Sequence, residues 1–245
     1  MKKNKNILIT GSSQGIGKNI AEILSAFNFN VFVTGRDIKK LETTAKEVHA
    51  KGFCAIDLTT DNAIDILFEK TLNTLGNIDV LINNAGQYIY NKIEQTAQKD
   101  AKNLIELNTL VPFLLTQKVV PQMKENRWGR IINIGSISGV TGEAYASLYS
   151  MTKASLIGFS KALALELAEF NITVNTINPG WVDTDLIKND CLNENFSHDE
   201  IIETIPQKRF IHPSEIANLC QYLISEEAKG ITGQSINLCA GLSVG

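Results

Sequence analysis

Short runs of apolar residues recur along the chain, and each is followed by a stretch long enough for a helix. The runs are rich in Val, Ile and Leu and read as nearly continuous, which is typical of parallel strands covered on both faces. They occupy residues 7–10, 31–34, 53–57, 79–83, 130–134, 173–178 and 235–238. Strands that alternate with helices in this way predict a Rossmann-type α/β fold, a doubly wound parallel sheet of about seven strands.

One segment interrupts this rhythm. Residues 186–209 follow the sixth run and are polar, with many Asn, Asp and Glu side chains. A polar insertion after a strand suits a substrate lid, which we expect to end shortly before a helix at 213–224. No repeat or Pro/Gly-rich linker divides the chain, so we expect residues 1–245 to form a single domain.

Composition and charge exclude several classes of partner. The chain has 245 residues, 44% of them hydrophobic, and a formal net charge of -3. It offers no basic surface to nucleic acid or to an anionic membrane. No segment reaches the roughly 18–20 apolar residues of a membrane span, and the apolar run near the N-terminus is too short for a signal peptide. We expect a cytoplasmic protein with neither nucleic-acid nor membrane partners.

The cysteines and histidines do not predict a metal site. They are scattered without C-x-x-C or similar spacing, at Cys54, Cys191, Cys220, Cys239, His49, His198 and His212. Dispersed thiols fit a reducing compartment better than a disulfide framework. We therefore expect no metal ion and reduced cysteines.

Three glycines separate the first strand from its helix in the sequence TGSSQGIG. Gly11, Gly15 and Gly17 would let the backbone turn tightly and approach a pyrophosphate at the helix N-terminus. Their spacing differs from G-x-G-x-x-G, and an ordinary strand-to-helix turn is the alternative. The position at the first strand of a βαβ series favours dinucleotide binding.

The end of the second strand bears on which dinucleotide is bound. An acidic residue there commonly binds the ribose 2′-hydroxyl of NAD, whereas an arginine suits the 2′-phosphate of NADP. This chain has Gly35 followed by Arg36, which favours NADP(H). Asp37 is a counter-argument, because it would either cap the next helix or bind a ribose. A solvated surface arginine is the alternative for Arg36.

A tyrosine and a lysine lie four residues apart in YSMTK, within an apolar helical stretch. Tyr149 and Lys153 would emerge on one face of that helix, where an ammonium group lowers the pKa of a phenol. Tyr88 and Lys92 have the same spacing. Only the first pair follows a serine at a strand end, Ser136, where ligands of open α/β sheets bind. We therefore favour Tyr149 and Lys153 as the reactive pair over a tyrosine buried for packing.

Several motifs occur in a fixed order: TGSSQGIG at 10–17, DL at 57–58, NNAG at 83–86, Asn108, GSIS at 135–138, YSMTK at 149–153 and NPGWVDT at 178–184. Together they resemble the short-chain dehydrogenase/reductase family over almost the whole chain. The likeness is greatest to bacterial 3-oxoacyl-(acyl carrier protein) reductases, because of the segments at 172–186, 205–217 and 231–244. Members of this family are usually tetramers.

The resemblance implies a role for each matching residue. Ser136 would hydrogen-bond the substrate oxygen, Tyr149 would protonate it, and Lys153 would contact the cofactor ribose. Asn108 would bend its helix and hold a water that links Lys153 to solvent, a kink without chemistry being the alternative. The catalytic residues would be Asn108, Ser136, Tyr149 and Lys153. The NADP(H)-binding residues would be Gly11, Ser13, Gly15, Ile16, Gly17, Arg36, Asp57, Leu58, Asn83, Ala85, Gly86, Tyr149, Lys153, Pro179, Gly180, Val182 and Thr184.

The resemblance implies an NADPH-dependent reductase of a carbonyl. Its leading substrate would be a 3-oxoacyl thioester, either on a small thiol or on acyl carrier protein. A second hypothesis is an alcohol or sugar dehydrogenase or a specialised-pathway ketoreductase. A third is a non-catalytic protein that binds a dinucleotide. We expect Arg127 and Arg130, at the start of the strand that ends near Ser136, to face an acidic carrier. Glu169 and Phe170 stand where a basic residue is common in such enzymes. We also expect a homotetramer that contacts through the helix of Tyr149 and the last strand.

Overall fold

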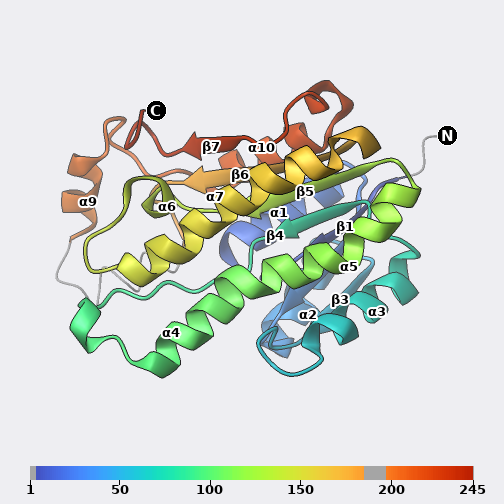
Figure 1. The fold of residues 1–245 in the computed structure, drawn as a ribbon, viewed down its shortest axis with the longest axis horizontal. Coiled ribbons are helices and arrows are strands. Elements are labelled where there is room, and N and C mark those ends of the chain that lie inside the picture. The colour runs from blue at the N-terminus through green and yellow to red at the C-terminus, as the bar shows by residue number, and fades with distance from the viewer. Residues whose placement is uncertain (1–3, 185–196, 245) are drawn as a thin grey trace.

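A single parallel sheet forms the centre of the protein (Figure 1). The computed structural model describes residues 4–184 and 197–244, so much of the expected lid, residues 186–196, lies outside the described residues. Within the described part, seven strands are ordered β3-β2-β1-β4-β5-β6-β7 and all pair in parallel. They are β1 (Asn6–Ile9), β2 (Asn30–Gly35), β3 (Gly52–Ala55), β4 (Val80–Asn83), β5 (Gly129–Ile134), β6 (Ile172–Pro179) and β7 (Ser235–Leu238).

Helices connect these strands and cover both faces of the sheet. The longer ones are α1 (Gly15–Ala26), α2 (Ile38–Glu47), α3 (Ala63–Leu75), α4 (Gln98–Ile105), α5 (Val111–Glu125), α7 (Ser147–Leu167) and α10 (Pro213–Ile224). Shorter elements are η1 (Ile93–Gln95), the π-helical turn η2 (Glu106–Leu110), α6 (Ser138–Thr141), η3 (Ala168–Phe170), α9 (His198–Thr204) and η4 (Glu226–Ala228). The doubly wound seven-stranded fold predicted from the apolar runs is confirmed.

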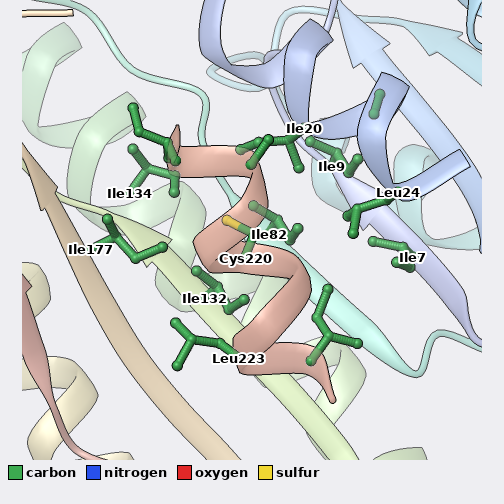
Figure 2. Packing of buried hydrophobic residues seen from close by; sticks show 14 of the residues in the cluster. Ile7, Ile9, Ile20, Leu24, Ile82, Ile132, Ile134, Ile177, Cys220 and Leu223 are labelled. Atoms are coloured by element: carbon green, nitrogen blue, oxygen red, sulfur yellow. The ribbon is translucent and has the colours of Figure 1, made fainter. Parts of the chain in front are cut away.

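Two hydrophobic layers explain why the strands read as continuous apolar runs. Side chains of a strand alternate between its faces, so Ile7 and Ile9 pack in one layer while Leu8 packs in the other. Helices α1, α2 and α10 cover the first layer, and α3, α5 and α7 cover the second. Figure 2 shows Cys220 and Leu223 of α10 packed in the first layer.

The parallel sheet directs every strand end to the same edge. In Figure 1 the arrows point toward the side of the molecule where α6 and α9 lie. The strand order reverses between β1 and β4, which is where doubly wound sheets open a binding crevice. The described part of the expected lid, from Ser197 onward, contains α9, which begins with a capping box between Ser197 and Glu200.

The described residues also bear on the expectations about metal ions, cysteines and membrane spans. Among the residues that the structure describes, no group of three or more His, Cys, Asp or Glu is arranged to hold a metal ion. Cys54, Cys220 and Cys239 are free and buried. None of the described helices combines the length and the apolar character needed to cross a membrane.

Candidate active site

The glycine loop between β1 and α1 forms a cradle that side chains would fill. Gly11 has a φ of 63°, and a Cβ atom there would lie 2.8 Å from the Cα atom of Ala85. A Cβ atom on Gly17 would lie 2.4 Å from the carbonyl oxygen of Gly11. Since real Cβ atoms do not approach backbone this closely, both positions require glycine. The loop therefore leaves backbone surface and the N-terminus of α1 open to a ligand.

A cavity of about 290 Å³ lies beside this loop. Most of the predicted dinucleotide-binding residues line it, namely Gly11, Ser13, Gly15, Ile16, Gly17, Arg36, Asp57, Leu58, Ala85, Gly86 and Thr184. Gln14, Gly35 and Asn84 also line it. The structure thus brings together segments that follow β1, β2, β3 and β4 at one edge of the sheet.

Charges at the far end of this cavity show which of the two neighbouring residues, Arg36 or Asp37, is available to a ligand. Arg36 is exposed and lines the cavity. Asp37 caps α2, because its Oδ1 accepts hydrogen bonds from the backbone N–H groups of Lys39 and Lys40 at 3.0 and 3.1 Å. Hydrogen bonds from Thr59 keep the pKa of Asp57 below its usual range, with a smaller contribution from Arg36. Asp57 is therefore an ionised hydrogen-bond acceptor, and the nearby Arg36, unlike Asp37, does not cap a helix.

A second cavity, of about 380 Å³, continues from the first toward the ends of β5 and β6. The predicted residues that line it are Ile16, Gly86, Ser136, Tyr149, Lys153, Pro179, Gly180, Val182 and Thr184. Ile16, Asn84, Gly86 and Thr184 line both cavities, so the two form one elongated site. A ligand that spans both would place one end against the glycine loop and the other against Tyr149.

Tyr149 and Lys153 emerge one turn apart on α7, as their spacing predicts. The Lys153 Nζ atom lies 5.8 Å from the centre of the Tyr149 ring and donates a 2.8 Å hydrogen bond to the carbonyl oxygen of Ile134. Burial raises the pKa of Tyr149 to about 12, a hydrogen bond with Ser136 opposes this, and the charge of Glu143 adds to it. Burial lowers the pKa of Lys153 to about 8. The expected lowering of the Tyr149 pKa by Lys153 is not seen in this structure, because burial has the largest effect on that pKa and Lys153 is not among the groups that shift it.

The arrangement of a glycine cradle, a long cavity and a Ser-Tyr-Lys group at one sheet edge agrees with three comparisons. The family model described as short chain dehydrogenase matches residues 5–195. The chain is a short-chain dehydrogenase. It is 38% identical to the 3-oxoacyl-[acyl-carrier-protein] reductase FabG of Aquifex aeolicus, over 98% of this chain and 98% of that protein. It is also 38% identical to the FabG protein of Buchnera aphidicola, over 98% of each chain.

Solved structures of reductases share the whole fold with this short-chain dehydrogenase. YwfH, an NADPH-dependent reductase involved in bacilysin biosynthesis, has a TM-score of 0.93 and 30% identity, over 99% of this chain and 100% of that one. A variant of actinorhodin polyketide ketoreductase with NADPH has a TM-score of 0.92 and 34% identity, over 98% and 97% of the two chains.

Two predicted residues of this short-chain dehydrogenase do not line either cavity. Asn83 is 2% exposed, and its Nδ2 atom donates a 2.8 Å hydrogen bond to Oδ1 of Asn133. The next residue, Asn84, lines both cavities and donates to the carbonyl oxygens of Thr10 and Gly11. Strand side chains alternate in direction, so a shift of one residue decides which asparagine reaches the ligand.

Asn108 is the second such residue, and it lies beneath the cavities in the π-helical turn η2. Its side chain is fully buried and makes three hydrogen bonds. Oδ1 accepts from the Gln87 N–H group at 2.9 Å, while Nδ2 donates to the Gln87 carbonyl at 2.9 Å and to Thr152 Oγ1 at 3.1 Å. The predicted helix distortion is present, and Asn108 fixes the loop after β4 against α7.

Tyr88 lies in the second cavity, although its partner by spacing does not. Its ring meets the Tyr149 ring edge-on at 4.9 Å, and its hydroxyl donates a 2.7 Å hydrogen bond to Glu143. Lys92 is exposed and precedes η1, so it shares no helix face with Tyr88. Tyr88 is thus a wall of the site rather than a second reactive pair.

A short chain of hydrogen bonds, absent from the sequence prediction, runs along the cavity wall. Ser136 Oγ donates to Ser138 Oγ at 3.1 Å, and Ser138 Oγ donates to Oε2 of Glu143 at 2.6 Å. Ser138 and Glu143 both line the cavity. All three residues follow β5, and Ser138 closes the GSIS motif, but the motif does not indicate that Ser138 contacts Glu143.

Arg127 and Arg130 do not border the active-site mouth of their own chain, so this expectation is wrong. They lie at the start of β5, and Ser136 follows its end, about 20 Å away at ~3.3 Å per residue. Arg130 is 0% exposed; it donates to the carbonyl oxygens of Gly129 and Asn171 and lies 3.7 Å from Glu226. Arg127 is exposed and donates to the Glu169 carbonyl at 2.7 Å. A fully buried arginine such as Arg130 cannot contact an acidic carrier protein.

Proposed function

We propose that this short-chain dehydrogenase reduces a carbonyl group to a hydroxyl with NADPH, and that its substrate is a 3-oxoacyl thioester. The observation that carries the proposal is the continuity of the two cavities, with the glycine cradle at one end and Ser136, Tyr149 and Lys153 at the other. The FabG relatives are named for 3-oxoacyl-[acyl-carrier-protein] reduction, and the YwfH structure is described as NADPH-dependent.

The residues of the first cavity fit NADP(H). The cradle at Gly11 and Gly17 is closed to a side chain but open to a pyrophosphate. Gly35 leaves the end of β2 without a carboxylate, and Arg36 is free of the capping contacts that hold Asp37. A guanidinium group there suits a 2′-phosphate, which supports NADPH over NADH.

NADPH supplies the hydride, and the protein supplies a proton and a polarising hydrogen bond. Tyr149 has a pKa of about 12, so its hydroxyl is protonated at neutral pH and can act as the acid toward the substrate oxygen. Ser136 lowers the pKa of Tyr149 against the effect of burial, and its hydroxyl, which here donates to Ser138, would turn to the substrate oxygen. Lys153 remains largely an ammonium group at neutral pH because its pKa is about 8. Asn108 holds Thr152 and the Gln87 backbone in place around this group.

The experiment that tests this function measures NADPH oxidation against a panel of ketones and 3-oxoacyl thioesters. Tyr149→Phe should remove most turnover and leave NADPH binding nearly unchanged, because only the acid is lost. Tyr88→Phe is the matched control and should retain most turnover. If no carbonyl compound is reduced, or if Tyr149→Phe is as active as the parent, the proposal fails.

Delivery of the acyl group by a carrier protein is the finer part of this proposal. The names of the FabG relatives support it, whereas the burial of Arg130 and the net charge of -3 weaken it. The test compares one acyl group on a small thiol and on carrier protein, in the parent and in Arg127→Ala. Because Arg127 lies at the opposite sheet edge, a loss confined to the carrier substrate requires that a second copy bring Arg127 to the mouth.

A specialised-pathway ketoreductase is the second candidate. The structures of YwfH and of actinorhodin polyketide ketoreductase support it by their similarity over nearly the whole chain. The cavity adds a specific reason, because the carboxylate of Glu143 lines it beside Ser138 and Tyr88. A preference for small functionalised ketones over 3-oxoacyl thioesters would favour this candidate.

The same proposal includes a cytoplasmic homotetramer built from single-domain chains with a lid at 186–209. Exposed apolar side chains on α5 and α7 support the oligomer: Phe113 is 46% exposed and Leu165 is 86% exposed. Ala164 and Leu167, on the helix of Tyr149 through which we expect this contact, are instead core residues. Free, buried thiols support a reducing compartment. Sedimentation that shows only monomer would remove the oligomer from the proposal.

A further inference from the structure

A carboxylate stands in the substrate end of the active-site cavity. Among the described residues that line this cavity, only Glu143 and Lys153 are charged. The Lys153 ammonium group is turned to the Ile134 carbonyl at 2.8 Å, and none of the ion pairs among the described residues involves Glu143. Glu143 therefore presents a negative charge without a basic partner to whatever occupies the cavity.

The backbone and side chain of Glu143 are both held in place. Its N–H group donates to Ser150 Oγ at 3.2 Å, and its carbonyl accepts from the Ala146 N–H group at 3.2 Å. The side-chain oxygens accept from Tyr88 and Ser138, at 2.7 and 2.6 Å, so the carboxylate bridges the loops after β4 and β5. A carboxylate fixed by contacts from two loops is a built feature of the cavity wall.

Two hydroxyl donors do not saturate a carboxylate. An ionised carboxylate has about four acceptor positions on its two oxygens. An acyl chain made only of CH₂ groups would displace water from the remaining positions without offering a hydrogen-bond donor in its place. Loss of these hydrogen bonds is costly for a charged group. A substrate that carries a hydrogen-bond donor would satisfy those positions instead.

The distance from Glu143 to the reacting carbonyl sets where that donor must be. Glu143 Oε2 is connected to Ser136 Oγ through Ser138, by contacts of 2.6 and 3.1 Å. The substrate oxygen must lie about 2.7 Å from Ser136 Oγ to accept its hydrogen bond. The two contacts keep Glu143 Oε2 within about 6 Å of Ser136 Oγ, so a donor on a carbon close to the carbonyl carbon is the one that Glu143 would meet.

We propose that Glu143 determines substrate specificity, by accepting a hydrogen bond from a hydroxyl or ammonium group on the first or second carbon beside the carbonyl that is reduced. This inference rests on the proposed carbonyl reduction and names the class of carbonyl compound that the cavity selects. Among 3-oxoacyl thioesters, it favours those that carry such a donor over a plain saturated chain.

The test uses two substrates that differ by one isosteric group. The N-acetylcysteamine thioester of 3-oxopentanoate carries a methyl group where that of 4-hydroxy-3-oxobutanoate carries a hydroxyl, on the carbon beside the ketone. Butanone and hydroxyacetone form the same pair for an enzyme that takes no thioester. The measured quantity is the ratio of kcat/KM for the hydroxylated member to that for the methyl member, with NADPH saturating.

The parent should prefer the hydroxylated member, and Glu143→Gln should lower the ratio by about tenfold or more, since hydrogen bonds to charged groups are the stronger ones. The loss should lie mainly in KM, because the contact exists before the reaction begins. Glu125→Gln, an exposed substitution at the end of α5, should leave the ratio unchanged. Tyr88→Phe removes one donor to Glu143 and should keep the preference or increase it.

Two results would overturn the inference while leaving the reductase intact. One is a parent enzyme whose kcat/KM for the methyl member equals that for the hydroxylated member. The other is a Glu143→Gln enzyme in which both members lose the same factor, which would make Glu143 a structural bridge only. Failure to reduce any member of either pair would instead overturn the proposed function together with the inference.

Discussion

Gly17→Ala tests whether the loop after β1 is a close-fitting cradle. The added Cβ atom would lie 2.4 Å from the Gly11 carbonyl oxygen, 2.5 Å from Nδ2 of Asn84 and 2.9 Å from the Ser12 Cα atom. Two of these three atoms belong to the backbone, so the contact is relieved only by moving the loop. The change therefore acts on the surface that would receive the pyrophosphate.

Two opposing effects determine how much Gly17→Ala changes the free energy of unfolding. Alanine gains up to about 1 kcal/mol over glycine inside a helix, but less in a first turn. Overpacking costs about 1–3 kcal/mol, and the two short backbone contacts place this site toward the upper end. We expect a net loss of about 1–2 kcal/mol, which is a fall in Tm of roughly 2–8 °C for a chain of this size. The Kd for NADPH should rise about tenfold or more, since the displaced Gly11 carbonyl and Asn84 form the floor of the site.

The measurements are thermal unfolding and a fluorescence titration with NADPH. Gly230→Ala is the control, because a Cβ atom on Gly230 has no neighbour within 4 Å. That variant should match the parent in both measurements. If Gly17→Ala keeps the parental Tm and Kd, the close approach of Gly11, Gly17 and Asn84 is not as described.

Two further changes probe separate parts of the site. Arg36→Ala should raise the KM for NADPH by about tenfold and leave that for NADH nearly unchanged, because a solvated charge-assisted contact to the 2′-phosphate is lost; equal effects on both cofactors in initial-rate kinetics would contradict this assignment. Asn108→Ala should lower the free energy of unfolding by roughly 2–5 kcal/mol in urea titrations, because it leaves the Gln87 backbone and Thr152 without their partner; an unchanged midpoint would show that solvent replaces these contacts.

The fold followed from the sequence because the sheet is covered on both faces. Each central strand is apolar on both sides, so the runs predicted at 7–10 and 79–83 match β1 and β4 within one residue. The third run, predicted at 53–57, is the outer strand β3 at Gly52–Ala55. Its last residues, including Asp57, instead lead into the first cavity.

The site was predictable wherever a motif determines geometry, and less so elsewhere. Tyr149 and Lys153 share a face because helix periodicity requires it, and the glycine spacing requires a close approach of backbone. Arg130 was misplaced because charge normally predicts exposure, whereas Trp128, Glu226 and backbone carbonyls surround this arginine. Glu143 was missed because its contacts join two loops that are distant in sequence. The pKa of Tyr149 depends mainly on burial, and the spacing of four residues between Tyr149 and Lys153 does not reveal how buried the tyrosine is.

The pKa of Tyr149 predicts different pH profiles for the two directions of the reaction. Reduction uses the phenol, which is fully protonated at neutral pH when the pKa is about 12. Oxidation of the alcohol uses the phenolate, whose fraction rises about tenfold per pH unit while the pH stays below that pKa. Between about pH 6 and pH 8, reduction should therefore be nearly flat and oxidation should rise about tenfold per unit, with saturating cofactor in each direction. Above about pH 8, the loss of the Lys153 proton affects both rates, so the window ends there. An oxidation rate that reaches a plateau within the window would mean that Lys153 lowers the pKa of Tyr149 during turnover, as the spacing of the two residues predicts, and that burial does not dominate in the working enzyme.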